Sequence, residues 1–176
     1  MYTIRYATLS DRAALETLIG DSVRGLSASD YSPAQIEAAI GNTMGVDSEL
    51  ITDGTFFVVE NAGRIVGCGG WSKRETLFGA DNKPGRVSRL LDPQAEAARI
   101  RAFFVHPDVA RHGIGRMLLE RCESEARDTG FQRAQLMATL PGRRLYEKYG
   151  YVAEEMIVHP ITGAVSIEFY PMAKTL

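Results

Sequence analysis

The sequence predicts one α/β (α+β) domain over residues 1–176, with a mixed central sheet of about seven strands flanked by about four helices. Three observations favour this class. A chain of 176 residues suits a single hydrophobic core. Hydrophobic residues make up 45% and charged residues 24%, the balance of an ordinary globular protein. Strand-like alternation and helix-like periodicity follow one another along the chain, with no internal repeat.

The first third of the chain predicts a strand followed by two helices. Residues 2–7 alternate in the manner of a half-buried strand. Ser10 can cap a helix whose apolar residues recur every three or four positions. Residues 32–35, Ser-Pro-Ala-Gln, combine an N-cap serine, a first-turn proline and a capping-box glutamine, and Gly41 can close that second helix.

The middle of the chain predicts a hairpin and then a long irregular excursion. Residues 55–60 and 64–71 have the composition of strands, joined by a turn at 61–63. Between residues 73 and 97 the sequence has neither helical nor strand periodicity and is rich in Gly, Pro, Asp and Arg. Loops of this length are usually functional or disordered, so we interpret the segment as a mobile functional loop or as a passive insertion.

The second half predicts alternating strands and helices. Residues 98–105 form a strand, and simple alternation places Ile100, Ala102 and Phe104 on one face. The remaining predicted elements are a helix over 113–129, a strand over 133–139, a short helix over 143–149, and a hairpin of 151–158 and 164–172 connected through 159–163.

Composition narrows the classes of function and location. The net charge of −2 argues against nucleic acid as the main partner, because phosphate backbones favour a basic face. Cys68 and Cys122 lack CxxC spacing and are expected to be reduced core residues. The chain has neither an apolar signal segment nor a run of about 18 apolar residues, so we expect a cytoplasmic protein without membrane association. The three histidines show no metal-ligand spacing, and we expect no metal.

The most informative segment is VHPDVARHGIGRMLL, residues 105–119, where a strand, a glycine-rich turn and a helix follow one another. The first N–H groups of a helix have no helical partner and carry partial positive charge, and glycine lets the backbone approach an anion. Arg111, His112 and Arg116 add donors and charge. No GK[ST] occurs in the chain, and Leu118 stands where GxGxxG requires its third glycine. The segment therefore predicts an anion site different from the two common nucleotide loops.

The longer stretch FFVHPDVARHGIGRMLLERC resembles motif A of the GNAT N-acetyltransferase superfamily, whose hexad [Q/R]xxGx[G/A] aligns with residues 110–115. Ala110 departs from the usual Gln or Arg, and Arg111 stands one residue further on. LYEKYGY, residues 145–151, resembles the [L/F]YExxG[F/Y] signature of the same family. The order of predicted elements also matches the family across nearly the whole chain. The resemblance implies the GNAT fold, with parallel strands 4 and 5 splayed apart, and acetyl-CoA as cosubstrate.

The resemblance also implies which residues contact acetyl-CoA. The pantetheine arm would pair with the backbone of residues 103–105, and the pyrophosphate would rest on N–H groups of residues 111–116. The implied cofactor-binding residues are Phe103, Phe104, Val105, Arg111, His112, Gly113, Ile114, Gly115 and Arg116. Tyr146 is the implied catalytic acid, since a tyrosine with a pKa of about 10 is protonated at neutral pH and can donate to the departing thiolate.

The same resemblance leaves the acceptor side open. Relatives often carry an asparagine before the tyrosine, whereas residues 139–142 here read Thr-Leu-Pro-Gly. For the general base we name no residue: Glu60, Glu154 and Glu155 are candidates, and an ordered water relay would also serve. Tyr31 and Trp71, together with the 73–97 segment, are acceptor-pocket candidates by position alone.

Several functions remain open from the sequence. The leading one is transfer of an acetyl group from acetyl-CoA to a primary amine, preferably of a small molecule, in a ternary complex. The alternatives are a protein or peptide N-acetyltransferase and a catalytically silent acyl-CoA-binding sensor or partner module. A nucleotide-binding domain is disfavoured by the absent motifs. Dimers are common in the family, so a homodimer is a further expectation.

Overall fold

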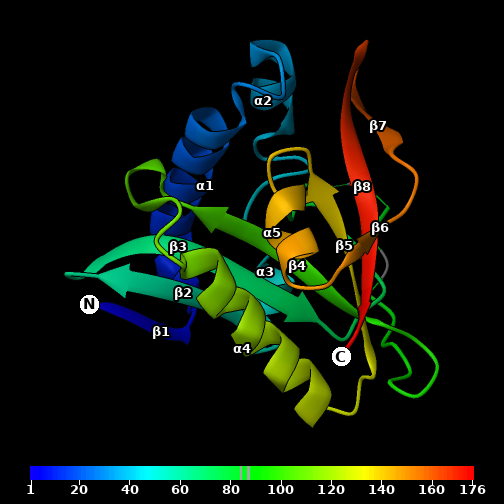
Figure 1. Ribbon diagram of the computed structural model, residues 1–176. Helices are drawn as coiled ribbons and strands as arrows, with labels where there is room; N and C mark the ends of the chain where they lie inside the picture. Colours follow the sequence, from blue (N-terminus) through cyan, green and yellow to red (C-terminus); the bar gives the residue numbers. More distant parts are fainter. Residues whose placement is uncertain (84, 87) are drawn as a thin grey trace.

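A computed structural model describes residues 1–83, 85–86 and 88–176, and these form one mixed sheet with helices on both faces (Figure 1). The strands are β1 (Tyr2–Tyr6), β2 (Phe56–Asn61), β3 (Arg64–Ser72), β4 (Ala98–Val105), β5 (Arg133–Thr139), β6 (Val152–Ala153), β7 (Ile157–Thr162) and β8 (Val165–Thr175). The α-helices are α1 (Arg12–Ser27), α2 (Pro33–Ala39), α3 (Ser48–Thr52), α4 (Ile114–Asp128) and α5 (Arg143–Lys148). In these described ranges no helix has the length and apolar composition needed to cross a bilayer.

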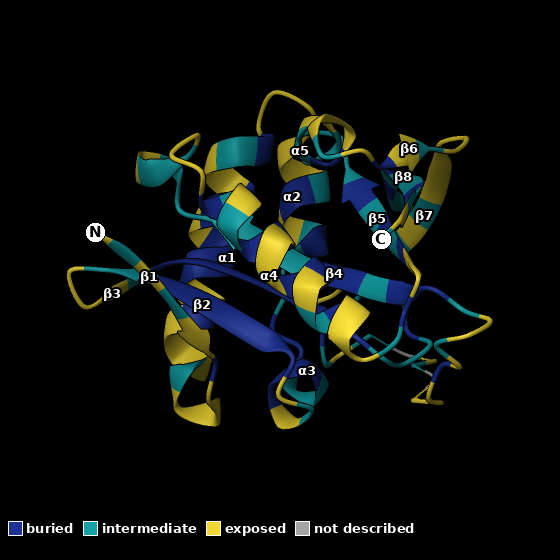
Figure 2. Cartoon of the chain, turned by 60° about the horizontal axis from the view of Figure 1, so that its bottom comes forward, coloured by how far each residue is buried: buried dark blue, intermediate teal, exposed yellow. Residues whose placement is uncertain are grey.

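The strands are ordered β1-β2-β3-β4-β5-β8-β6, with β7 paired to β8, and the predicted mixed α/β class is confirmed. The sheet has a hydrophobic cluster on each face. On one face Leu118 and Cys122 of α4 pack with strand residues such as Ile100. On the other face Leu15 and Ile19 of α1 pack with α2, α3 and the opposite side of the same strands. Figure 2 shows the result: β2 is largely buried between the layers, and α4 exposes its outer side.

The parallel pair β4 and β5 stays together for two residues and then diverges. Its register consists of Ala98↔Ala134 and Arg99↔Gln135. Beyond these pairs β4 continues beside β3, while β5 pairs along its whole length with β8. The splay expected between strands 4 and 5 is therefore confirmed, and it leaves the β5-facing edge of β4 without a neighbouring strand.

A β-bulge in β4 changes which side chains share a face. Gly69 of β3 stands opposite two residues of β4, Ala102 and Phe103, and Ala102 has a φ of +57°. Because a bulge inserts one extra residue, the alternation reverses there. Ile100 therefore packs in the α4-side cluster, whereas Ala102 and Phe104 pack against the α1-side cluster. The prediction that these three residues share one face was wrong for this reason.

The helix α3 and the C-terminal strands also differ from the prediction. The short helix α3 was not predicted; the Asp47 carboxylate caps it by accepting from the Glu49 N–H. The predicted strand 151–158 is divided into β6 and β7, and β7 runs through residues assigned to the loop 159–163. Pro160 was interpreted as a loop residue, but β7 pairs with β8 alone, and proline is tolerated on an edge strand.

The segment from 73 to 97 folds back on itself and is fastened by charged side chains. The Glu75 N–H donates to the Arg89 carbonyl oxygen, and the Leu91 N–H donates to that of Lys73. The Arg74 guanidinium binds both carboxylate oxygens of Asp53, at 2.7 and 2.9 Å. Pro84 and Val87, which belong to this predicted excursion, lie outside the described residues. The described part is therefore an excursion held against the end of α3.

The two cysteines provide a test of the packing. Both are free and fully buried, and burial raises the pKa of Cys68 to about 12 and that of Cys122 well above its ordinary value. A thiolate is needed for attack on a disulfide reagent, so we expect negligible reaction with Ellman's reagent at pH 8 in the native protein. In guanidinium chloride both thiols should react. A rapidly reacting native thiol would show that the core opens more easily than this packing implies.

Candidate active site

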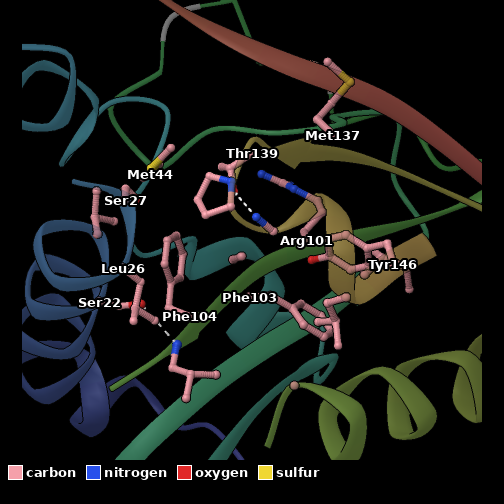
Figure 3. Close-up of a pocket in the computed structure, with 18 of the residues that line it drawn as sticks. Ser22, Leu26, Ser27, Met44, Arg101, Phe103, Phe104, Met137, Thr139 and Tyr146 are labelled. Carbon is pink, nitrogen blue, oxygen red and sulfur yellow. Dashed lines mark hydrogen bonds between the residues drawn. The ribbon is translucent and has the colours of Figure 1, made fainter. Parts of the chain in front are cut away.

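A cavity of about 610 Å³ opens where β4 and β5 diverge. Its wall is made by α1, the C-terminal half of β4, the loop before α4 with its first turn, the end of β5 and α5, together with residues 43–45, residues 77–79 of the predicted excursion and Phe169 of β8. Figure 3 shows Ser22 and Leu26 entering from α1, Phe103 and Phe104 from β4, and Tyr146 from α5. The splayed strands thus place a glycine-rich loop, an open strand edge and a tyrosine around one space.

The glycine-rich loop has the backbone geometry of an anion site. Gly113 is the N-cap of α4 with a φ of +86°, which favours glycine. The first helical bond is donated by the Met117 N–H to the Gly113 carbonyl oxygen, so the preceding N–H groups of the first turn have no helical partner. At Gly115 a Cβ would stand 3.0 Å from the Leu145 side chain, so glycine also suits the close packing of α4 on α5. An anion at this turn would meet several N–H groups and the positive end of the helix dipole.

The open edge of β4 presents main-chain groups to the cavity. The Val105 N–H points away from β3 and donates to the Ser22 Oγ on α1, at 3.2 Å, as the dashed line in Figure 3 shows. The next residue, His106, donates instead to the Val66 carbonyl oxygen on the β3 side. An unpaired edge of this kind can accept an extended ligand as an additional strand.

Tyr146 lies on α5 and points into the cavity (Figure 3). Its ring packs edge-on against Phe103 and Tyr151, with centroid distances of 6.0 and 5.8 Å. Burial raises the pKa of the Tyr146 hydroxyl, and the nearby Cys122 raises it further. The hydroxyl therefore holds its proton through neutral pH and can act as a donor.

Most of the sequence-predicted ligand residues line this cavity. The lining includes Phe103, Phe104, Val105, Arg111, Gly113, Ile114, Gly115, Arg116 and Tyr146. His112 is exposed on the same turn and lies outside the lining. Thr139, Pro141 and Gly142 belong to the segment before Tyr146 in which the resemblance led us to expect an asparagine. These three residues also line the cavity.

The structure places Tyr31 and Trp71 away from the cavity wall. Both are buried, with exposed fractions of 4% and 3%. The Tyr31 hydroxyl donates to the Glu168 carbonyl oxygen at 2.7 Å and accepts from the Leu140 N–H at 2.8 Å. The Trp71 Nε1 donates to a Glu125 carboxylate oxygen at 3.3 Å. These partners use the polar atoms that an acceptor contact would require, so both residues support the frame around the site.

The glutamates considered as general bases also lie elsewhere. Glu60 pairs with Arg5 at 2.7 Å on the β1–β2 side, and Glu154 and Glu155 are exposed. Among the described residues that line the cavity there is no carboxylate, whereas five are basic: Arg101, Arg111, Arg116, Arg144 and Lys148. The cavity is therefore electropositive and suits anionic ligands.

Sequence reasoning missed several polar residues of the cavity wall, among them Ser22, Thr43 and Arg101. Ser22 lies on α1, a helix that was predicted from its apolar residues. Arg101 carried a usable signal, since it is flanked by the apolar residues Ile100 and Ala102 in the middle of a strand, where arginine is unusual. Thr43, in the connection after α2, offers no local pattern that marks it.

The domain that contains this cavity resembles known proteins. A family model for the acetyltransferase (GNAT) domain matches residues 52–153, which span β2 to β6 and include the loop and Tyr146. No curated protein sequence matches the chain.

Solved structures show the same fold. A GCN5-related N-acetyltransferase from Rhodopseudomonas palustris superposes with a TM-score of 0.73 at 22% identity, covering 99% of this chain and 95% of that one. The PaiA N-acetyltransferase of Thermoplasma acidophilum, in complex with coenzyme A, gives 0.67 at 16% identity, covering 100% and 99%. YncA of Salmonella typhimurium, a putative acetyltransferase with acetyl-CoA, gives 0.65 at 19% identity, covering 99% and 94%.

The raised pKa of Tyr146 can be measured directly. Ionised tyrosine absorbs near 295 nm, and the contribution of Tyr146 is the part of this absorbance that is lost in the Tyr146→Phe variant. We expect this contribution to develop only above pH 10, because burial disfavours the charged form. The difference between the titration curves of wild type and variant measures it, with circular dichroism confirming that the fold persists. A difference centred at or below pH 10 in folded protein would contradict the assigned environment.

Proposed function

The chain belongs to the acetyltransferase (GNAT) domain family, and from this premise we propose that it is a cytoplasmic enzyme that transfers an acetyl group from acetyl-CoA to a primary amine of a small molecule. The observation that carries the proposal is the divergence of β4 from β5, with the glycine loop at one end of the opening and Tyr146 beside it. Direct attack of the amine in a ternary complex fits a single cavity that these groups share.

The glycine loop and the β4 edge have complementary roles in holding acetyl-CoA. The pyrophosphate would accept hydrogen bonds from N–H groups of residues 113–116, each contributing about 1.5–3 kcal/mol because the acceptor is charged. Arg111 and Arg116 add positive charge at the same turn. The pantetheine amides would pair with the main chain at Phe103 and Val105, and the Val105 N–H would exchange its Ser22 partner for the ligand.

Tyr146 supplies the proton that the departing sulfur requires. Acetyl transfer breaks the thioester C–S bond, and the released thiolate has a thiol pKa of about 8.5. The Tyr146 hydroxyl is protonated at neutral pH and points into the cavity, so it can donate to that sulfur. A main-chain N–H near Phe104 is the proposed donor to the carbonyl oxygen as negative charge develops there.

The acceptor amine must lose a proton before or during attack, since an alkylammonium has a pKa of about 10.4. No carboxylate stands among the described cavity residues to take that proton directly. We therefore propose that the proton leaves through water in the cavity mouth.

Two glycines with matched backbone conformations test the cradle. Gly113→Ala forces a side chain into the left-handed region at φ +86°, and Gly163→Ala does the same at φ +53° in the β7–β8 turn, far from the cavity. Both variants should lose about 1–2 kcal/mol of stability. Only Gly113→Ala should weaken acetyl-CoA binding, roughly tenfold, because relief of strain turns the first N–H groups of α4. Calorimetric titration measures the affinities, and equal affinities in the two variants would contradict the cradle.

Tyr146→Phe tests the acid. Removal of a positioned general acid should lower kcat by about 100-fold or more, while the Kd for acetyl-CoA changes little. Tyr6→Phe, on β1 outside the cavity lining, is the control for loss of one tyrosine hydroxyl and should leave kcat near wild type. The readout is CoA release over a panel of amines. Unchanged turnover across neutral pH would remove Tyr146 from the mechanism, and binding of acetyl-CoA without turnover of any amine would favour the sensor alternative.

A further inference from the structure

Arg101 is a buried cation whose hydrogen-bonding capacity is only partly used. It projects from β4 into the cavity wall and is 4% exposed. Its Nη2 donates to the Gly79 carbonyl oxygen at 2.7 Å and lies 2.7 Å from the Asp47 Oδ2. Its Nε and Nη1 have no hydrogen-bond partner within the described part of the chain. Buried guanidinium groups normally satisfy their donors, so these free N–H groups indicate a missing acceptor.

Thr43 presents a second buried polar atom without a partner in the same cavity wall. Its Oγ1 is inaccessible and unpaired among the described residues. The chain segment of Gly79 and Ala80 connects the two groups: Gly79 accepts from Arg101, and the Ala80 N–H donates to the Asn42 carbonyl oxygen, next to Thr43. A hydroxyl and a guanidinium on one short stretch of wall form a donor set suited to a carboxylate.

The charges around Arg101 are unbalanced toward the positive. Asp47 is shared, because the Arg86 Nη2 also contacts it at 2.9 Å, and Arg86 further contacts Glu49 at 3.2 Å. Lys83 lies close enough to both arginines that they lower its pKa, in addition to burial. Burial lowers the pKa of Arg101 and Arg86 lowers it further, although Asp47 and Glu49 act in the opposite direction. An anion in the cavity would supply the charge that this cluster lacks.

The acceptor itself must satisfy the electrostatics of the cavity. A simple amine or polyamine arrives as a cation. Arg111 and Arg116 stand at the pyrophosphate turn, so at the other end of the cavity such a cation meets the buried Arg101 and, among the described lining residues, no carboxylate. An amine that also carries a carboxylate brings its own counter-charge. The rest of that end of the cavity is apolar, with Met44, Phe78, Met137 and Phe169 in its wall.

We propose that the acceptor is an amino acid or a similarly small amine with a carboxylate and an apolar side chain. Arg101 and Thr43, whose unpaired atoms have almost no exposed surface in this structure, turn toward the cavity to bind the carboxylate. Arg101 and Phe103 line the same cavity and are two residues apart on β4, so one small molecule can place its carboxylate at Arg101 and its amine near the thioester. This inference rests on the proposed acetyl transfer, and it adds the class of acceptor.

The direct test uses matched acceptors with the wild-type enzyme. Methionine and phenylalanine are compared with their decarboxylated amines, 3-(methylthio)propylamine and phenethylamine, and with the amino acid amides. We expect kcat/KM for the acids to exceed that for the amines and amides by roughly 10- to 100-fold, since the carboxylate gains charge-assisted hydrogen bonds. Turnover of amines with no preference for the carboxylate would overturn the inference and leave the proposed function intact. No turnover of any amine by protein that binds acetyl-CoA would instead contradict the proposed function.

Two variants assign the preference to these residues. Arg101→Lys keeps a cation beside Asp47, and Thr43→Val keeps the shape of the side chain without its hydroxyl. Each should lower the acid-to-amine ratio at least fivefold, mainly through KM, with the acetyl-CoA Kd unchanged. Arg99→Lys, on the same strand but outside the lining, is the control and should keep the ratio. If Arg101→Lys fails to fold, the acid-to-amine ratio of kcat/KM in Thr43→Val, compared with that of the wild type, still tests the assignment. A wild-type ratio retained in every folded variant would overturn the assignment.

Discussion

The parting of β4 from β5 after Arg99 is the constraint on which the rest of the structure depends. A strand edge inside a folded domain leaves N–H and C=O groups without partners, and each such buried group costs about 1–3 kcal/mol. The fold meets part of this cost internally, since Ser22 accepts from the Val105 N–H. The remainder of the edge lines the cavity. An edge of this kind can accept an extended ligand as an additional strand.

The bulge at Ala102 gives the two sides of that opening different chemistry. The extra residue turns Phe103 toward Tyr146 and the α4 side of the sheet, while Arg101 and Ala102 face the α1 side. The proton donor and the buried cation therefore stand on different walls although two residues separate Phe103 from Arg101 in sequence. Without the bulge Arg101 and Phe103 would share a face, because alternate residues of a regular strand point to the same side.

The features predictable from the sequence are those with a local physical signal. The anion loop is readable because Gly113, Gly115 and the following amphipathic helix are contiguous, and the order of strands and helices follows from periodicity. The bulge was not predictable, since ARIRAFFV alternates acceptably in either register and Gly69 on the neighbouring strand decides between them. Tyr31 and Trp71 were assigned to the acceptor pocket by position, but hydrogen bonds to distant partners fix them in the frame. The sequence marks Arg101 as unusual in its strand, but its partners Gly79 and Asp47 become known only from the folded structure.

Amide hydrogen exchange by NMR, with and without coenzyme A, tests the central claim that the open edge of β4 and the first turn of α4 form one ligand site. The account predicts increased protection at Phe103 and Val105 and at residues 113–116, with little change at β1 and in the β7–β8 turn. Protection that leaves the β4 edge unchanged, or that appears first on another strand, would contradict it.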